Sequence, residues 1–397
     1  MHFSTRILCP ALVRRVRFAA LIGAAITTTG EAQQHTTQPI PDVALPKPTA
    51  TLKDGFKTAQ SIHEFADGRL LLVDAEAKKV VLADLAAGTV SERMSEGPED
   101  GEFRRFGALW RWSGDSAAAI DLGKGRFTIF SPDGMPARFG RAPRLPIVRE
   151  LIGTESAVGA AMPPRVAPTG PAGVAPPPRV PFPVVRVSLR TLRLDTVAQL
   201  MPGQAPRAPM TNNAVGTWTA YIGTTPLQPI DAWTALSDGT VAVVRAATYR
   251  VEWFPLVGEH EFSEPVPYMP IAVTAADREI VADSFKTAAR VALRTSPLRT
   301  AILAATFKDP PTWPTTHPPF RGDVPPLVDR LDRIWLTTRC TNDERARCYD
   351  VLSRKGERVA RYRLPANMRV IGFGAGTVYT AVAQKDDKDI VQRHSLP

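Results

Sequence analysis

Cysteine and histidine are scarce in this chain of 397 residues, which has three cysteines and six histidines. Clusters of these residues at metal-ligand spacing are not found. The sequence also has no P-loop, no nucleophile elbow, no paired metal-binding histidines and no catalytic-triad spacing. Inference about this protein therefore depends on composition, targeting signals and repeat pattern rather than on a catalytic motif.

No apolar run near the N-terminus is long enough to span a bilayer, since residues 18–26 form only a short one. Arginines precede this run, and Gly30-Glu31-Ala32 follows it, with small residues three and one before Gln33. The pattern predicts a secretory signal peptide over residues 1–32, no transmembrane segment, and a periplasmic or secreted protein. Arg14-Arg15 leaves a twin-arginine route open beside the ordinary secretory route.

Removal of the signal peptide takes away Cys9 and leaves Cys340 and Cys348. These two flank a polar loop, residues 341–347, between two strand-like runs. Two cysteines across a hairpin of an exported protein are most simply a disulfide, and the pair offers too few ligands for a metal ion. We therefore predict a Cys340–Cys348 disulfide.

The sequence does contain a recurring pattern of turn, strand, loop and strand. Its clearest copy begins at Asp67-Gly68, where glycine supplies the positive φ of a tight turn, and continues through apolar runs at 70–74 and 80–84. Further copies begin near Gly114, Asp238, Arg333 and Gly376. Recurrence at roughly 40–50 residues is typical of a β-propeller. The pattern predicts an all-β fold, a six-bladed β-propeller over residues 50–397.

Several segments depart from the repeat. Residues 33–49 are polar and predict a flexible leader, whereas 50–53 predict a strand that completes the last sheet and closes the ring. The proline-rich segment 162–183 cannot continue a strand ladder and predicts a long loop from blade three. Residues 274–293 have an N-cap threonine and apolar residues at helical spacing, which predict one inserted α-helix.

The second unit carries a more specific resemblance. A loop ending in Gly101-Glu102-Phe103, a strand, a Gly114-Asp115 turn and the run 125–134 are similar to an NHL-type repeat. The chain resembles the exported bacterial six-bladed propeller proteins built from such repeats, best over about residues 60–140. The resemblance implies the fold and no single activity, because such propellers serve as binding platforms, signalling domains and occasional enzymes.

Chemistry in a propeller takes place where the innermost strands converge on the central channel. The polar residues that we predict there are His63, Glu64, Arg111, Asp231 and Asp329. The simpler explanation is that they are hydrated channel side chains or turn formers at strand ends. Lactonase-type propellers hold a divalent cation with oxygen ligands that suit Ca²⁺, and Glu64, Asp231 and Asp329 are similar to such a set. A metal-dependent, lactonase-like hydrolase or a lyase is therefore the alternative hypothesis.

The main hypothesis is non-enzymatic binding or scaffolding by a monomer without a cofactor. The chain carries a formal net charge of +10. Arg104, Arg105, Arg111 and Trp112 lie in or just after a non-repeating loop, and such cationic and aromatic groups suit an anionic surface. Export removes nucleic acid as a partner, so we predict a protein or an acidic glycan.

Overall fold

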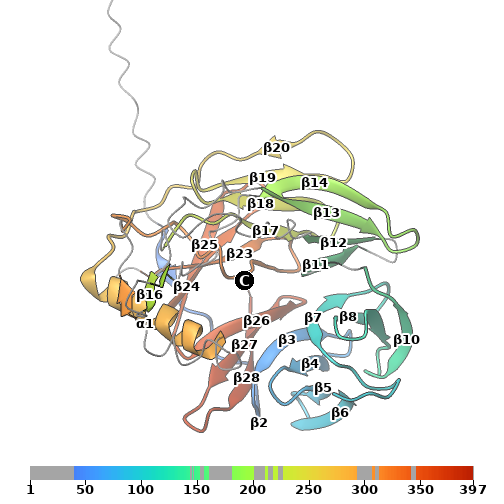
Figure 1. The fold of residues 1–397 in the computed structure, drawn as a ribbon. Helices are drawn as coiled ribbons and strands as arrows, with labels where there is room; N and C mark the ends of the chain where they lie inside the picture. Colours follow the sequence, from blue (N-terminus) through green and yellow to red (C-terminus); the bar gives the residue numbers. More distant parts are fainter. Residues whose placement is uncertain are drawn as a thin grey trace, which may run out of the picture. The chain divides into compact units, whose positions relative to one another are not determined.

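The repeated pattern of turns and strands folds into four-stranded antiparallel sheets, which are the blades of a six-bladed propeller (Figure 1). Blade one consists of β3 (Ala59–Glu64), β4 (Leu70–Asp74), β5 (Lys79–Asp84) and β6 (Thr89–Ser95). Gly68 in its first turn has a φ of 85°, a conformation that favours glycine because a Cβ atom would strain it. The predicted fold class is confirmed.

The computed structural model describes residues 40–143, 145, 147–152, 156–160, 181–200, 211–212, 218–221, 227–292, 306–308, 313–340 and 346–396. They belong to one unit that spans Pro39–Pro397. The predicted signal peptide and nearly all of the proline-rich segment 162–183 lie outside the described residues.

Blades two to four repeat the order of blade one from the inner to the outer strand. Blade two consists of β7 (Phe106–Arg111), β8 (Ala117–Asp121), β9 (Arg126–Phe130) and β10 (Pro136–Arg141). Blade three consists of β11 (Ile147–Ile152), β12 (Ser156–Ala160), β13 (Phe182–Ser188) and β14 (Leu194–Leu200). Blade four consists of β17 (Ala232–Ala235), β18 (Val241–Arg245), β19 (Arg250–Phe254) and β20 (Glu261–Phe262). β13 thus begins inside the predicted loop, with Pro183 near its first residue, where a missing N–H group is tolerated.

Blades five and six are joined through the N-terminal segment. Blade five contains β22 (Leu327–Val328), β23 (Ile334–Thr338), β24 (Arg347–Leu352) and β25 (Arg358–Leu364). Blade six contains β26 (Met368–Gly374), β27 (Thr377–Ala383), β28 (Asp389–Ser395) and, as its outer strand, β2 (Ala50–Phe56). β2 pairs antiparallel with β28, with Ala50 opposite Arg393. The prediction that an N-terminal strand closes the ring is confirmed.

The segment before β2 differs from the predicted flexible leader. β1 (Asp42–Val43) pairs in parallel with β25 as a fifth strand of blade five. The Asp42 carboxylate lies 3.2 Å from Nε of Arg361, and His394 donates from Nδ1 to the Pro46 carbonyl at 2.7 Å. Backbone pairing and these polar contacts therefore fix the last ten residues before β2 to blades five and six.

The hydrophobic core lies between neighbouring blades. All five residues of β4 are buried, so its side chains on both faces pack against other sheets. Leu72 of blade one, for example, shares a cluster with Tyr379 of blade six. In the sequence, strands that are buried on both faces are nearly continuous runs of apolar residues rather than alternating apolar and polar residues.

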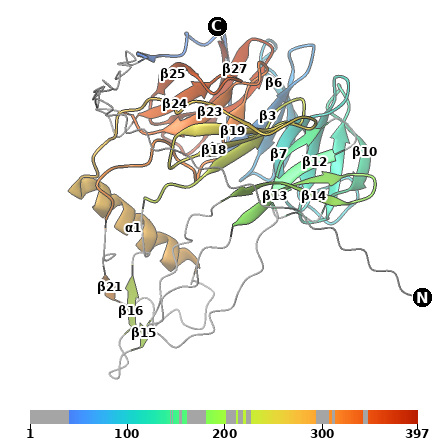
Figure 2. The ribbon, with the colours of Figure 1, turned by 90° about the horizontal axis from the view of Figure 1, so that it is seen from above.

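The inner strands begin on one face of the propeller, here called the entry face. They end at the hairpin turns on the other face, the turn face. The connections between blades belong to the entry face, and two of them contain extra elements: α1 (Ala275–Ala292) and a small sheet of β15 (Thr211–Asn212), β16 (Trp218–Tyr221) and β21 (Thr306–Lys308). Figure 2 shows both to one side of the blades.

α1 confirms the predicted inserted helix. Its N-terminus is closed by a capping box, in which the Asp277 amide donates to Oγ1 of Thr274 and the Thr274 amide donates to Oδ2 of Asp277. No helix among the described residues is long and apolar enough to span a membrane.

Candidate binding site

The six inner strands surround a central pocket of about 380 Å³. Each inner strand contributes to its lining: Ile62, Trp110, Glu150, Thr234, Leu327 and Gly372. The turn residues Ser113, Ser237 and Asp332 also line it, which places the pocket toward the turn face. Its volume is within the range of small-molecule binding sites, roughly 300–1,000 Å³.

Three arginines line this pocket: Arg111 at the end of β7, Arg149 in β11 and Arg330 just after β22. No hydrogen bond or ion pair joins the side chain of Arg111 to another described residue. Burial and repulsion from Arg111 lower the pKa of Arg330, and burial lowers the pKa of Arg149. Asp329 and Asp332 also line the pocket, but their carboxylates pair with Arg333 and Arg354. The three lining arginines therefore give the pocket an excess of positive charge, which favours an anionic ligand.

Glu150 also lines the pocket, yet it does not neutralise these charges at pH 7. Burial raises the pKa of Glu150 to about 8, against the opposing effect of Arg111 and Arg330. The Leu151 amide donates to Oε1 of Glu150 at 3.2 Å. Since Glu150 is mostly protonated at neutral pH, it presents a hydrogen-bond donor instead of a negative charge.

His63, predicted in the channel, does line the central pocket. Burial, together with the charges of Arg330 and Arg111, lowers the pKa of His63 to about 3. Its ring packs edge-on against Phe65, with centroids 4.9 Å apart, and its Nε2 atom is buried without a hydrogen-bond partner among the described residues. The imidazole is thus neutral at pH 7.

Glu64, the neighbour of His63, instead joins blade one to blade six. Its carboxylate accepts hydrogen bonds from the Ala375 amide, Thr377 Oγ1 and Tyr379 Oη, at 2.9, 3.2 and 3.0 Å. A Cβ atom added to Gly374 would lie 1.3 Å from Oε2 of Glu64, so only glycine leaves room for this contact. Glu64 is therefore held between blades.

Asp329, predicted in the channel, does line the central pocket, whereas Asp231 is not among the lining residues; both carboxylates are paired with arginines. Asp231 precedes β17 on the entry face and pairs with Arg245 at 2.8 Å. Asp329 follows β22 on the turn face, pairs with Arg333 at 2.7 Å and accepts from Nε1 of Trp335 at 3.0 Å.

The described part of the chain brings no three His, Cys, Asp or Glu side chains together in a way that could hold a metal ion. Glu64, Asp231 and Asp329, the residues suggested for Ca²⁺, have the separate protein partners just described. The calcium hypothesis gains no support from their geometry.

The predicted binding residues lie at opposite ends of β7. Arg104 and Arg105 precede the strand on the entry face, where their side chains are exposed and their amides donate to the Asp121 carboxylate at 3.0 Å. Arg111 and Trp112 lie at its other end and line the central pocket. Trp112 is only 7% exposed and packs against Phe127. The four residues therefore do not form a single surface.

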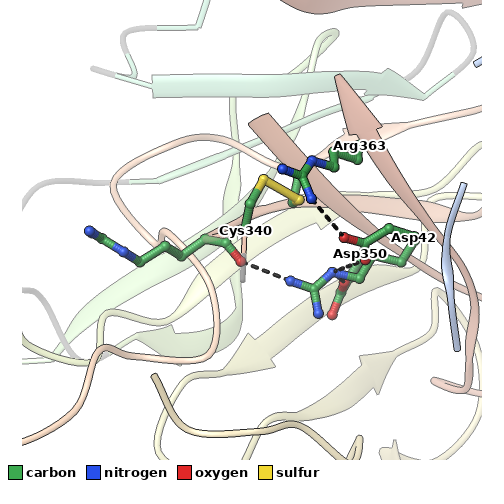
Figure 3. Close-up of a disulfide and its surroundings, with 7 residues drawn as sticks. Asp42, Cys340, Asp350 and Arg363 are labelled. Atoms are coloured by element: carbon green, nitrogen blue, oxygen red, sulfur yellow. Dashed lines mark hydrogen bonds and ion pairs between the residues drawn. A yellow bond between two sulfur atoms is a disulfide. The ribbon is translucent and has the colours of Figure 1, made fainter. Parts of the chain in front are cut away.

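The Cys340–Cys348 disulfide is present, with Cα atoms 5.3 Å apart. Cys340 follows the end of β23 and Cys348 lies in β24, where Thr338 is its neighbour across the ladder. Figure 3 shows the bridge beside Arg363 and the ion pairs that hold Asp42. It therefore lies at the junction of blade five with the N-terminal segment.

Sequence reasoning missed Arg149, Glu150 and Arg330. Arg149 and Glu150 lie in a blade that repeat matching identified poorly, so their strand could not be recognised as an inner one. Arg330 follows an inner strand of only two paired residues. Their position within each blade could have indicated these three residues, because residues at the end of the first strand of every blade face the same channel.

No protein-family model matches the chain, so the resemblance to NHL repeats remains a prediction. No curated protein matches its sequence. Many solved structures are similar in fold. A DUF4221 family member from Bacteroides vulgatus has 8% identity and a TM-score of 0.45, with 89% of this chain and 95% of that chain covered.

Two further solved structures extend this comparison. The calcium-binding protein regucalcin from Agrobacterium tumefaciens has 9% identity and a TM-score of 0.40, with 88% of this chain and 96% of that chain covered. A gluconolactonase from Xanthomonas campestris has 12% identity and a TM-score of 0.41, with 91% of this chain and 99% of that chain covered. At such identities the likeness concerns the fold alone.

Proposed function

We propose that the protein is an exported, non-enzymatic binding module whose ligand is an acidic glycan held in the central pocket. The main supporting observation is the group of Arg111, Arg149 and Arg330, which line one pocket. The aspartates in the same lining, Asp329 and Asp332, pair with Arg333 and Arg354, and Glu150 is mostly protonated at pH 7. A bound carboxylate would relieve the repulsion between Arg111 and Arg330. The predicted signal peptide and the disulfide support export, because disulfides persist in oxidising compartments.

The aromatic lining supports a glycan rather than an inorganic anion. Trp110, Trp112 and Phe373 line the pocket together with the arginines. The indole N–H of Trp110 already donates to the Arg149 carbonyl at 2.6 Å, so this side chain contributes apolar atoms to the lining rather than a further donor. Apolar ring faces beside a few convergent polar groups are typical of sites for small organic ligands.

The alternative of acid–base catalysis by His63 and Glu150 is less well supported. A general base is most effective when its pKa lies near the working pH. The pKa of His63, at about 3, makes this imidazole a weak base at neutral pH, so that only Glu150, with a pKa of about 8, lies near the working pH. Binding therefore remains the preferred interpretation.

Calorimetry with oligogalacturonate tests the location of binding. Arg111→Ala should weaken binding by about 10- to 100-fold, since a charge-assisted hydrogen bond contributes roughly 1.5–3 kcal/mol. Added salt should also weaken binding by the unmodified protein. Arg138→Ala, an exposed arginine on β10, is the matched control and should bind normally.

The double variant Arg104→Ala/Arg105→Ala separates the two ends of β7. Unchanged binding by this variant, together with loss in Arg111→Ala, would support the central pocket. The reverse result would move the site to the entry face. Equal affinity of the unmodified protein for oligogalacturonate and for a neutral galactose oligomer would contradict an acidic ligand.

A further inference from the structure

The central pocket is enclosed laterally by the blades and opens only along the axis of the ring, which limits how a polymer can enter it. Its lining includes residues from every one of the six inner strands. β2 pairs with β28, so the N-terminal strand completes the last sheet and leaves the ring without a lateral opening between its ends. An open groove can bind the middle of a chain, but a pocket ringed by strands admits a chain only by its end.

The pocket also offers two kinds of polar group that a sugar acid requires. The guanidinium groups of Arg111, Arg149 and Arg330 suit a carboxylate, since arginine forms bidentate hydrogen bonds with that group. His63 and Glu150 add groups that are neutral at pH 7 and suit hydroxyls.

His63 in particular has an unmet hydrogen-bonding requirement. Its Nε2 atom is buried and has no partner among the described residues, and the residue as a whole is only 6% exposed. Leaving a buried polar nitrogen unpaired is unfavourable. A ligand hydroxyl beside the imidazole would remove that penalty, whereas a simple fatty acid would not.

From these observations we infer that the pocket binds the terminal residue of a glycan that ends in a uronic acid. This inference rests on the proposed function, which requires only an acidic glycan. The carboxylate lies against the arginines, a ring hydroxyl bonds to His63, and the sugar ring packs on the aromatic lining. A free uronic acid therefore occupies the same place as the chain end.

Competition calorimetry tests end-on binding with trigalacturonate as the reporter ligand. Free galacturonate should displace it, whereas galactose should not. A trigalacturonate blocked at both ends should bind at least tenfold more weakly than the unblocked form. Equal binding of the blocked form, without competition by galacturonate, would overturn end recognition and leave the proposed function intact. If neither trigalacturonate nor galacturonate binds, both proposals fail.

His63→Phe tests hydroxyl recognition, because phenylalanine keeps an aromatic ring and removes both nitrogens. Galacturonate affinity should fall roughly tenfold, the effect of one lost hydrogen bond, while affinity for hexanoate stays unchanged. His260→Phe is the matched control, since this exposed histidine lies on blade four, where its ring stacks on Phe254. An equal loss for both ligands would indicate a change of pocket shape and overturn the role of His63. Unchanged galacturonate affinity in a folded variant would overturn it too.

Discussion

Single aspartates organise the entry to the inner strands. Asp74 at the end of β4 accepts from the amides of Lys57 and Thr58, each at 2.9 Å, just before β3 begins. Asp121 at the end of β8 does the same for Arg104 and Arg105 before β7. The carboxylate in each case supplies the acceptors that a chain needs where it leaves one sheet and enters the next.

Glu150 predicts a pH dependence of stability that can be separated from that of His63. The pKa of Glu150 rises from 4.5 to about 8 on folding, so its stabilisation is present below pH 4.5 and lost as pH rises through 8. The pKa of His63 falls from 6.5 to about 3, so its stabilisation is present above pH 6.5 and lost as pH falls through 3. The two effects offset each other between pH 4.5 and 6.5; only that of His63 changes below this range, and only that of Glu150 changes above it.

We therefore expect the free energy of unfolding to fall by about 2 kcal/mol between pH 6.5 and 8 on account of Glu150. Urea titrations across this range measure the effect. Glu150→Gln should remove the decline, whereas Glu259→Gln, at an exposed position on blade four, should retain it. A decline of the same size in Glu150→Gln would show that another group is responsible.

At the scale of the element, blade five is held by contacts that lie outside its own ladder. The Arg361 side chain donates to the carbonyl of Arg339 at 2.8 Å and pairs with Asp42 of β1. Arg339 in turn pairs with Asp277 at the start of α1. The residue before the disulfide thus connects the inserted helix, blade five and the N-terminal segment.

The disulfide should stabilise this junction. Both cysteines are buried, and the bridge closes a short loop with a sequence separation of 8. Cys340→Ala/Cys348→Ala should lower the free energy of unfolding by about 2–3 kcal/mol, mainly because the unfolded chain gains freedom. Urea denaturation of the oxidised protein and of the variant gives the difference. Free thiols in unreduced mature protein would contradict the bridge.

At the scale of the whole molecule, ring closure depends on a strand from the opposite end of the chain. β2 starts next to the end of β28, because Ala50 lies opposite Arg393 and Phe56 opposite Asp389. Leu52 of β2 is buried in the cluster shared by blades six and one. Removal of β2 would expose this apolar surface and leave an unpaired edge on β28.

A circular permutant tests closure directly. Moving residues 49–56 from the N-terminus to a position after Pro397, through a short glycine linker, should preserve a single cooperative thermal transition. Deleting residues 49–56 without replacing them should lower the transition temperature or abolish cooperativity. A deletion variant as stable as the permutant would show that β2 is dispensable.

Much of this architecture was determined by the sequence alone, because turns and strand-length apolar runs are local features. Asp67-Gly68 specifies a tight turn through its backbone, and the runs at 70–74 and 80–84 are strands wherever they pack. The disulfide could also be predicted from the sequence, because Cys340 and Cys348 flank a single hairpin. These signals depend on neighbours in the chain, and the structure confirms them.

Only the tertiary structure decided what the central pocket contains. Arg111, Glu150 and Arg330 come from blades two, three and five, and nothing local in the sequence relates them. Glu64 and His63 are adjacent in sequence, yet the carboxylate turns toward blade six while the imidazole lines the pocket. Burial and charge at the centre of a closed ring depend on all six blades at once, so these properties emerge only when the ring is complete.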